Sequence, residues 1–269
     1  MIDKNRKIDI MGIVNLTDDS YFAQSRCGDT DAALARTEML ITEGAGIIDI
    51  GACSTRPGSE AVGSEEEWRR LEPALKAIRE AFPDVRISVD TYWADIVERT
   101  FGLIGDFIVN DISAGEDDPD MLQTVGRLGL QYVAMHKKGT PKTMQSLCDY
   151  DDVTREVARY FAVFAEKAEA AGIKDWILDP GFGFAKNVAQ NYELLGGLSC
   201  LKAMCGDRRI LVGISRKSMI YRHFNITPEE SLPATQVLHY RALQLGADIL
   251  RVHDVAQALQ TVQLYRILG

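Results

Sequence analysis

The sequence lacks the features that direct a protein to a membrane, to nucleic acid or to an oxidising compartment. None of its apolar runs approaches the roughly 20 residues of a membrane-spanning helix, and its first residues lack the apolar core of a signal peptide. Its formal net charge is -9, whereas nucleic acids and anionic membranes call for a basic surface. Its 5 cysteines include no C-x-x-C pair, which favours reduced thiols. We therefore expect a cytoplasmic protein that binds neither nucleic acid nor membrane.

Several catalytic signatures are also missing from the chain. Its 4 histidines have no partner four residues away on a shared helix, which is the spacing typical of a helical zinc site. The sequence has no P-loop, no G-x-S-x-G and no kinase signature, and no G-x-G-x-x-G follows the first expected strand. These absences argue against a zinc enzyme, a serine hydrolase and a dinucleotide-binding protein.

What the chain does have is eight short apolar segments, each followed by a helical pattern. Strands are expected at 9–15, 47–50, 86–90, within 105–113 where the strand ends in Asn110 and Asp111, and at 131–136, 176–179, 210–215 and 248–252. Such alternation predicts either a closed (β/α)8 TIM barrel or an open doubly wound sheet. Polar residues end nearly every strand rather than only those beside one crevice, which favours the barrel. With no linker in 269 residues, we expect a single domain over 1–269.

Local patterns give two further expectations. Ser64 and Glu67 have the spacing of a capping box at the start of an amphipathic helix. Asp49 lies inside an apolar strand, where an unpaired carboxylate is costly, so we expect it to make a structural hydrogen bond.

In a barrel all strand C-termini meet at one rim, so polar residues far apart in sequence become neighbours. Those expected there are Asn15, Thr55, Arg56, Asp90, Asn110, Asp179, Lys217, Arg251 and His253. Taken singly, each also has a structural interpretation, such as a helix cap at Asp90 or a turn at Asp179. Together, the cations Arg56, Lys217, Arg251 and His253 suit a phosphate, and the carboxylates and amide suit the N–H groups of a heterocycle. The residues expected at the rim therefore predict a binding site for a phosphorylated nitrogen heterocycle.

Eight segments, in this order and spacing, resemble dihydropteroate synthase over almost the whole chain. They are Met11–Thr17 with Asp19 and Ser20, Ser54–Gly58, Ser88–Thr91, Asn110–Ile112, Met135–His136 with Gly139–Gln145, Leu178–Phe184, Gly213–Ser218 and Arg251–Val255. The family is a TIM barrel that joins 4-aminobenzoate to 6-hydroxymethyl-7,8-dihydropterin diphosphate in folate biosynthesis and releases diphosphate. The resemblance implies this activity, a Mg²⁺ cofactor, a homodimer formed through late helices, and a sulfonamide target.

The resemblance also implies a role for each matching residue. The pterin would be held by Asp90, Asn110, Asp179 and Lys217, with Ile112 and Met135 lining it. The diphosphate would be held by Asn15, Thr55, Arg56, Arg251 and His253, with Asn15 also a ligand of Mg²⁺. The 4-aminobenzoate pocket would be shaped by Thr55, Pro57, Phe182, Lys217 and Ser218.

The chain departs from the family pattern at a few positions. Asp18 replaces the usual Pro, Ala52 and Cys53 replace Gly and Glu, and Ala185 replaces a Gly. The expected pterin and diphosphate residues are intact, so these departures affect the expected reaction class little. Two other functions stay open: a corrinoid-linked methyltransferase on a related barrel, and a pterin-phosphate binding module without catalysis. The two cationic segments at Lys217 and Arg251 favour the synthase, since the methyltransferase has no diphosphate to bind.

Overall fold

The structure is a computed structural model that describes residues 6–16, 30–53, 63–140, 143–206 and 208–268. Three expected site residues, Thr55, Arg56 and Pro57, lie outside these ranges.

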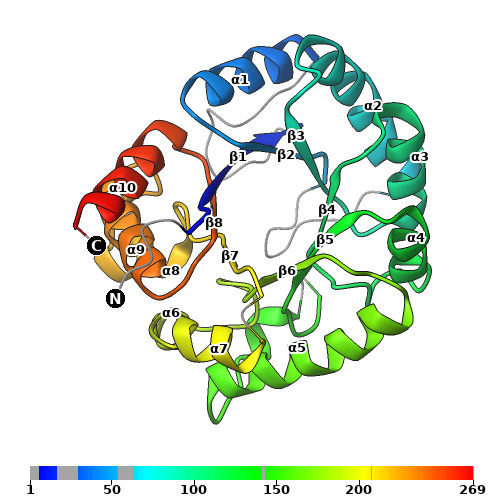
Figure 1. Cartoon of the computed structure of the whole chain (residues 1–269). Helices are drawn as coiled ribbons and strands as arrows, with labels where there is room; N and C mark the ends of the chain where they lie inside the picture. The colour runs from blue at the N-terminus through cyan, green and yellow to red at the C-terminus, as the bar shows by residue number, and fades with distance from the viewer. Residues whose placement is uncertain (1–5, 17–29, 54–62, 141–142, 207, 269) are drawn as a thin grey trace.

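The described chain alternates strands and helices from end to end (Figure 1). The strands are β1 (Asp9–Asn15), β2 (Ile47–Gly51), β3 (Arg86–Asp90), β4 (Ile108–Asp111), β5 (Gln131–Met135), β6 (Trp176–Asp179), β7 (Leu211–Val212) and β8 (Ile249–Val252). The helices are α1 (Thr30–Thr42), α2 (Ser64–Ala81), α3 (Ala94–Ile104), α4 (Met121–Leu128), α5 (Val153–Ala170), α6 (Val188–Gly196), α7 (Leu198–Met204), α8 (Ser218–Phe224), α9 (Leu232–Gln244) and α10 (Val255–Leu268), with a short 3-10 helix at Met144–Ser146.

The strands form one parallel sheet in the order β6-β5-β4-β3-β2-β1-β8-β7. Its two outer strands meet through a parallel bridge between Leu178 and Ile210, and the Leu178 amide donates to the Arg209 carbonyl at 3.0 Å. The sheet is therefore closed, and Figure 1 shows the helices around the ring of strands. The expected TIM barrel is confirmed, and the open doubly wound sheet is excluded.

Alternation of side chains along each strand divides the barrel interior into layers. The middle layer is apolar and buried, and consists of Met11, Ile47, Ile108, Val133, Ile177, Leu211 and Ile249. Residues two positions earlier on the strands form a polar layer at the N-terminal end, where Arg86 donates to Asp9 at 3.1 Å. Residues two positions later include Asp49, Asn110, Asp179 and Arg251, at the C-terminal end. The apolar layer thus separates two polar ends of the barrel.

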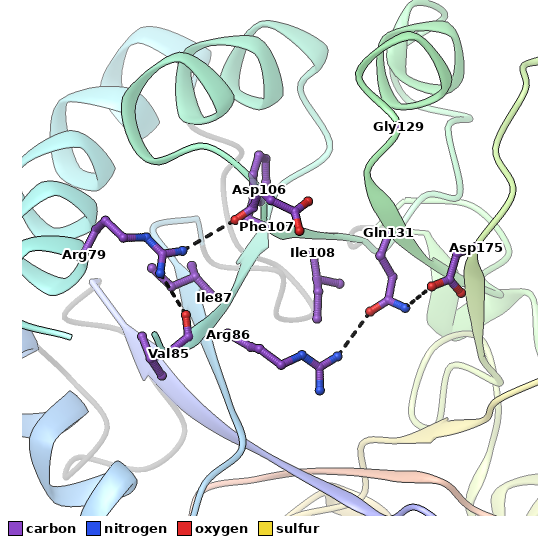
Figure 2. Close-up of a pocket in the computed structure, with 10 residues that line it drawn as sticks. All are labelled: Arg79, Val85, Arg86, Ile87, Asp106, Phe107, Ile108, Gly129, Gln131 and Asp175. Carbon is purple, nitrogen blue, oxygen red and sulfur yellow. Dashed lines mark hydrogen bonds between the residues drawn. The ribbon is translucent and has the colours of Figure 1, made fainter. Parts of the chain in front are cut away.

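A cavity of about 450 Å³ opens at the N-terminal end (Figure 2). Arg79 donates to the Val85 carbonyl at 2.9 Å, and Arg86 reaches Gln131 at 3.4 Å. These guanidinium groups already bond to the protein around the cavity. None of the expected site residues lines it.

The structure differs from the sequence analysis in three local details. The capping box at Ser64 is wrong, because α2 begins at Ser64 and its N-cap is Gly63, which has no side chain to cap it. The seventh strand is shorter than expected, with only Leu211 and Val212 in β7. In the described ranges, two helices rather than one follow both β6 and β7.

Candidate active site

Strand register brings most of the expected residues to the same end of the barrel. Asn15 pairs with Gly51, Gly51 pairs with Asp90, and Asp90 pairs with Asn110 on the next strand. Gly51 allows a close approach here, because a Cβ at this position would lie 3.3 Å from the Asp90 Cβ. On the other side of the barrel, Met135 pairs with Asp179. The residues therefore form one continuous rim although their numbers span most of the chain.

Asp49 is the centre of a hydrogen-bond network just inside this rim. It is fully buried, and it accepts from Ser88 Oγ at 2.6 Å and from Asn110 Nδ2 at 3.2 and 3.3 Å. Arg251 Nε donates to Asp49 Oδ2 at 2.6 Å, and Arg251 Nη2 donates to Asp90 Oδ2 at 2.8 Å. The expected structural role of Asp49 is confirmed. Its network also fixes the amide of Asn110 and links Arg251 to Asp90.

Burial and neighbouring charges shift the pKa values of three rim residues. Burial raises the pKa of Asp90 to about 7, with Arg251 opposing and Asp49, Asp111 and Asp179 adding to the rise. Burial also raises the pKa of Asp179, against the effect of Lys217. The pKa of Lys217 is lowered to about 8 by burial, which Asp179 partly offsets. The rim therefore holds two carboxylates and an ammonium group that all titrate closer to neutral pH than usual.

The turn after β6 joins Asp179 to Lys217. Asp179 Oδ1 accepts from the Gly181 amide at 2.8 Å, and Lys217 Nζ donates to the Phe182 carbonyl. Gly181 has a φ of 70°, and a Cβ there would lie 1.9 Å from the His136 carbonyl oxygen. Only glycine fits this position, because any side chain would be both strained and blocked.

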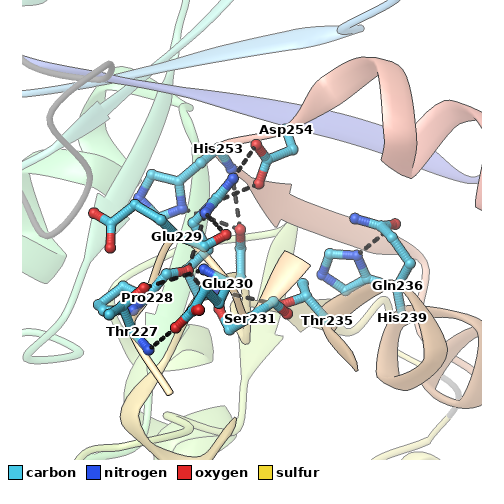
Figure 3. Close-up of polar contacts among 12 residues, drawn as sticks. Thr227, Pro228, Glu229, Glu230, Ser231, Thr235, Gln236, His239, His253 and Asp254 are labelled. Atoms are coloured by element: carbon cyan, nitrogen blue, oxygen red, sulfur yellow. Dashed lines mark hydrogen bonds and ion pairs between the residues drawn. The ribbon is translucent and has the colours of Figure 1, made fainter. Parts of the chain in front are cut away.

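An ion pair between the exits of β7 and β8 fixes the cationic side of the rim. Arg216 donates from Nε and Nη2 to the two carboxylate oxygens of Asp254, both at 2.8 Å. Its Nη1 also donates to the carbonyls of Pro228 and Glu229, both at 2.9 Å. Figure 3 shows Asp254 and His253 close to the segment 227–231. Arg216 thereby ties this segment to the strand exits that carry Lys217 and His253.

The surroundings of His253 oppose a positive charge on its ring. Its Nδ1 lies 3.0 Å from Ser215 Oγ, and its carbonyl accepts from Arg36 at 2.7 Å. Burial, followed by the positive charges of Arg251 and Arg216, lowers the pKa of His253 to about 3. The imidazole is therefore neutral at neutral pH, and it offers a hydrogen bond rather than a positive charge. The sequence analysis expected a cation here, and only the fold shows the neighbouring arginines that oppose its charge.

The remaining expected residues surround this polar rim. Ile112, Met135 and Phe182 are buried, and Ser218 is half-buried at the first position of α8. Asn15 is half-buried at the end of β1, where an amide oxygen is a suitable hard ligand for Mg²⁺. In the described part of the chain, no three His, Cys, Asp or Glu side chains form a group that could hold a metal.

Several residues of the site were missed by the sequence analysis. Ser88 and Ser215 are hydrogen-bond partners of Asp49 and His253; Ser88 lies at an interior position of β3, and Ser215 lies in the turn after β7. Strand alternation could have identified Ser88. Lys186 bonds to the turn that carries Asp179, and only its place directly after that turn could have indicated it.

Comparisons with known proteins agree with this geometry. Residues 11–253 match the family model described as pterin binding enzyme. The chain is 40% identical to the dihydropteroate synthase of Escherichia coli K12 over 257 residues, which is 95% of this chain and 89% of the relative. The crystal structure of Yersinia pestis dihydropteroate synthase, a sulfonamide drug complex, superposes with a TM-score of 0.92 at 36% identity, covering 99% and 96% of the two chains. The Xanthomonas albilineans enzyme, solved with 4-aminobenzoic acid, has a TM-score of 0.87 at 35% identity, covering 97% and 93%. Among the described residues, no helix has the length and apolarity needed to cross a membrane.

Proposed function

This chain belongs to the pterin binding enzyme family, among the dihydropteroate synthases, and from that premise we propose how its residues carry out the reaction. The enzyme transfers a pterin group onto 4-aminobenzoate, using 6-hydroxymethyl-7,8-dihydropterin diphosphate and releasing 7,8-dihydropteroate and diphosphate. One observation carries the assignment of the site: Asp49, Asp90, Asn110 and Arg251 form one network at the rim.

The pterin would bind between the two carboxylates and the ammonium group of the rim. Asp90 and Asp179 can accept hydrogen bonds from the N–H groups of the pterin ring, and Lys217 can donate to its carbonyl and ring nitrogen. Because Asn110 Nδ2 donates to Asp49, its Oδ1 is oriented as the acceptor for the ligand. Ile112 and Met135 supply the apolar walls. This arrangement matches the alternating donors and acceptors along one edge of a pterin.

The diphosphate would lie beside Arg251 and His253, at the exit of β8. Arg251 holds a positive charge there between Asp49 and Asp90, and neutral His253 can donate a hydrogen bond. Thr55 and Arg56, outside the described residues, complete this set in our proposal. Asn15 would hold a Mg²⁺ ion, which when bound helps to neutralise the charge of the leaving diphosphate.

The reaction would begin with departure of the diphosphate, followed by attack of the aniline nitrogen on the pterin methylene carbon and loss of one N–H proton from that nitrogen to water. Arg251 stabilises the negative charge that grows on the leaving group, and Asp90 and Asp179 favour positive charge on the pterin. The aniline nitrogen is already neutral near pH 7, so no strong general base is required. Phe182, Lys217 and Ser218, with Thr55 and Pro57 outside the described residues, would form the 4-aminobenzoate pocket. We propose that a sulfonamide would compete there.

We further propose that the chain acts as one domain over 1–269, in the cytoplasm and as a homodimer. The dimer is supported by exposed apolar side chains on two neighbouring helices: Val237 on α9 is 68% exposed, and Ile267 on α10 is 71% exposed. Sedimentation velocity tests this point, because a species with the mass of one chain at micromolar concentration would contradict it.

Diphosphate release tests the proposed function. Purified protein is mixed with the pterin diphosphate, 4-aminobenzoate and Mg²⁺, and each component is then omitted in turn. Release that requires both organic substrates supports the synthase. Tight pterin binding without release would support the non-catalytic binding module instead, and methyl transfer from methyltetrahydrofolate would support the corrinoid-linked enzyme.

A further inference from the structure

A buried lysine holds the turn that follows β6. Lys186 is only 3% exposed, and its Nζ lies 2.9 Å from His136 Nδ1, 3.0 Å from the Gly181 carbonyl oxygen and 3.0 Å from the Phe184 carbonyl oxygen. An ammonium group has three N–H donors and no acceptor, so each donor has one partner here. The contacts therefore suit the charged form of Lys186 and a neutral His136 that accepts at Nδ1.

The turn needs this support because its backbone is unusual. Gly181, Gly183 and Ala185 have φ values of 70°, 83° and 50°, which lie in the left-handed region. A second buried residue, Asn191, accepts from the Gly183 amide at 2.7 Å. Lys186 and Asn191 thus hold the turn from side chains that do not belong to the rim.

The same turn positions both pterin groups on this side of the site. Gly181 donates its amide to Asp179 and gives its carbonyl to Lys186. Phe182 gives its carbonyl to Lys217. Lys186 is therefore one hydrogen-bonded residue away from Asp179, and its positive charge favours the ionised carboxylate.

We propose that Lys186 is a positioning residue of the pterin subsite, which fixes the turn 180–185 and adds to Lys217 and Arg251 a buried positive charge that favours the carboxylate form of Asp179. The proposal rests on the proposed function, since it takes Asp179 as a pterin ligand. The role proposed for Lys186 is not part of the proposed function, because Lys186 bonds to the turn 180–185 and not to the rim.

Other charged groups act on the same pair. Lys217 and Arg251 also favour the ionised form of Asp179. Around Lys186, Asp179 favours its charge, Lys217 and Lys138 oppose it, and Cys148 would favour it only as a thiolate. Burial is the largest effect, and it lowers the pKa of Lys186 to about 7. The contribution of Lys186 to Asp179 is therefore present in acid solution and is lost as the pH rises through that value.

Equilibrium binding of the probe 6-hydroxymethyl-7,8-dihydropterin to Lys186→Met tests the proposal. Calorimetry without 4-aminobenzoate avoids turnover, and the probe carries no phosphate that could titrate. Without the charge of Lys186 a larger fraction of Asp179 is protonated in acid solution, so we expect several-fold weaker binding at about pH 6. At about pH 8.5 the difference from the parent should fall to about twofold, because Asp179 is ionised in both proteins and Lys186 of the parent has lost its charge.

Two further variants separate the effect of Lys186 on the position of the turn from the effect of its charge on Asp179. Asn191→Ala loosens the same turn without removing a charge, so its loss of affinity should be equal at the two pH values. Lys186→Arg retains the charge and should keep the pH dependence of the parent, which tests the proposal even if Lys186→Met fails to fold. A Lys186→Met loss that is independent of pH, or a pH-dependent loss in Lys186→Arg, would overturn it. If the parent itself does not bind the probe, the proposed function fails, whereas a parent that binds alongside an unaffected Lys186→Met overturns only this inference.

Discussion

Replacing Asp49 by asparagine tests the network on which the rim is built. The change keeps the shape of the side chain but removes its charge, and it places an amide N–H group opposite donors from Ser88 and Asn110. Arg251 would then keep only one carboxylate partner, Asp90. The fully buried position means that water cannot replace the lost charge.

The size of the effect follows from these contacts. Removing one partner of a buried ion pair costs about 3–5 kcal/mol. Because Arg251 retains Asp90, we expect the lower end, about 3 kcal/mol in the free energy of unfolding. For a chain of this size, that corresponds to a melting temperature lower by roughly 6–12 °C. Urea unfolding followed by circular dichroism measures the free energy directly.

The matched control is Ser88→Ala, which removes one donor to Asp49 and leaves the ion pair intact. It should lower the free energy of unfolding by about 1.5 kcal/mol, as expected for a hydrogen bond to a charged group. In a double-mutant cycle, Asp49→Asn and Arg251→Met should show a coupling energy of at least about 1 kcal/mol. An Asp49→Asn protein as stable as the parent, or a coupling energy near zero, would refute the network as the support of the rim.

Three other predictions concern the rim itself. Affinity for the pterin diphosphate should be highest between about pH 7 and about pH 8. It falls at lower pH because Asp90 is protonated, and at higher pH because Lys217 loses its proton. A plot of kcat/KM against pH should show both decreases, and Asp90→Asn should lack the decrease in acid. Lys217→Ala or Asp179→Asn should raise the KM for the pterin substrate by about tenfold or more while the fold survives, and unchanged kinetics in either variant would remove that residue from the site. Gly181→Ala should lower the free energy of unfolding by about 3 kcal/mol or more, because the new Cβ meets the His136 carbonyl. The control Gly172→Ala, at a position with φ of 77° and open space, should lower it by about 1–2 kcal/mol. Equal losses of stability in urea unfolding would contradict the steric argument.

The sequence predicted the barrel because the information needed was local. Eight apolar segments alternate with helical patterns, and closure followed from polar residues at nearly every strand end. The short β7 was not predictable, because residues 210–215 have the pattern of a longer strand and only pairing decides where it ends. The capping box at Ser64 failed for a similar reason: the spacing was right, but the helix began one residue earlier than a cap at Ser64 requires.

The positions of the described candidate residues at the rim were predictable from the sequence, but their charge states were not. Residues such as Asp90 and Lys217 could be placed at the rim from their positions at strand ends. The neutral state of His253 depends on burial and on Arg251 and Arg216, which come from other parts of the chain. Lys186 was missed because it looks like a surface lysine until the fold shows three acceptors around it.

The most direct test of the account is a crystal structure of the protein with 6-hydroxymethyl-7,8-dihydropterin bound. We predict that the ring lies at the C-terminal end of the barrel, with its N–H groups on Asp90 and Asp179 and its carbonyl on Lys217. A ring bound instead in the cavity beside Arg79 and Arg86, at the opposite end of the barrel, would contradict the account.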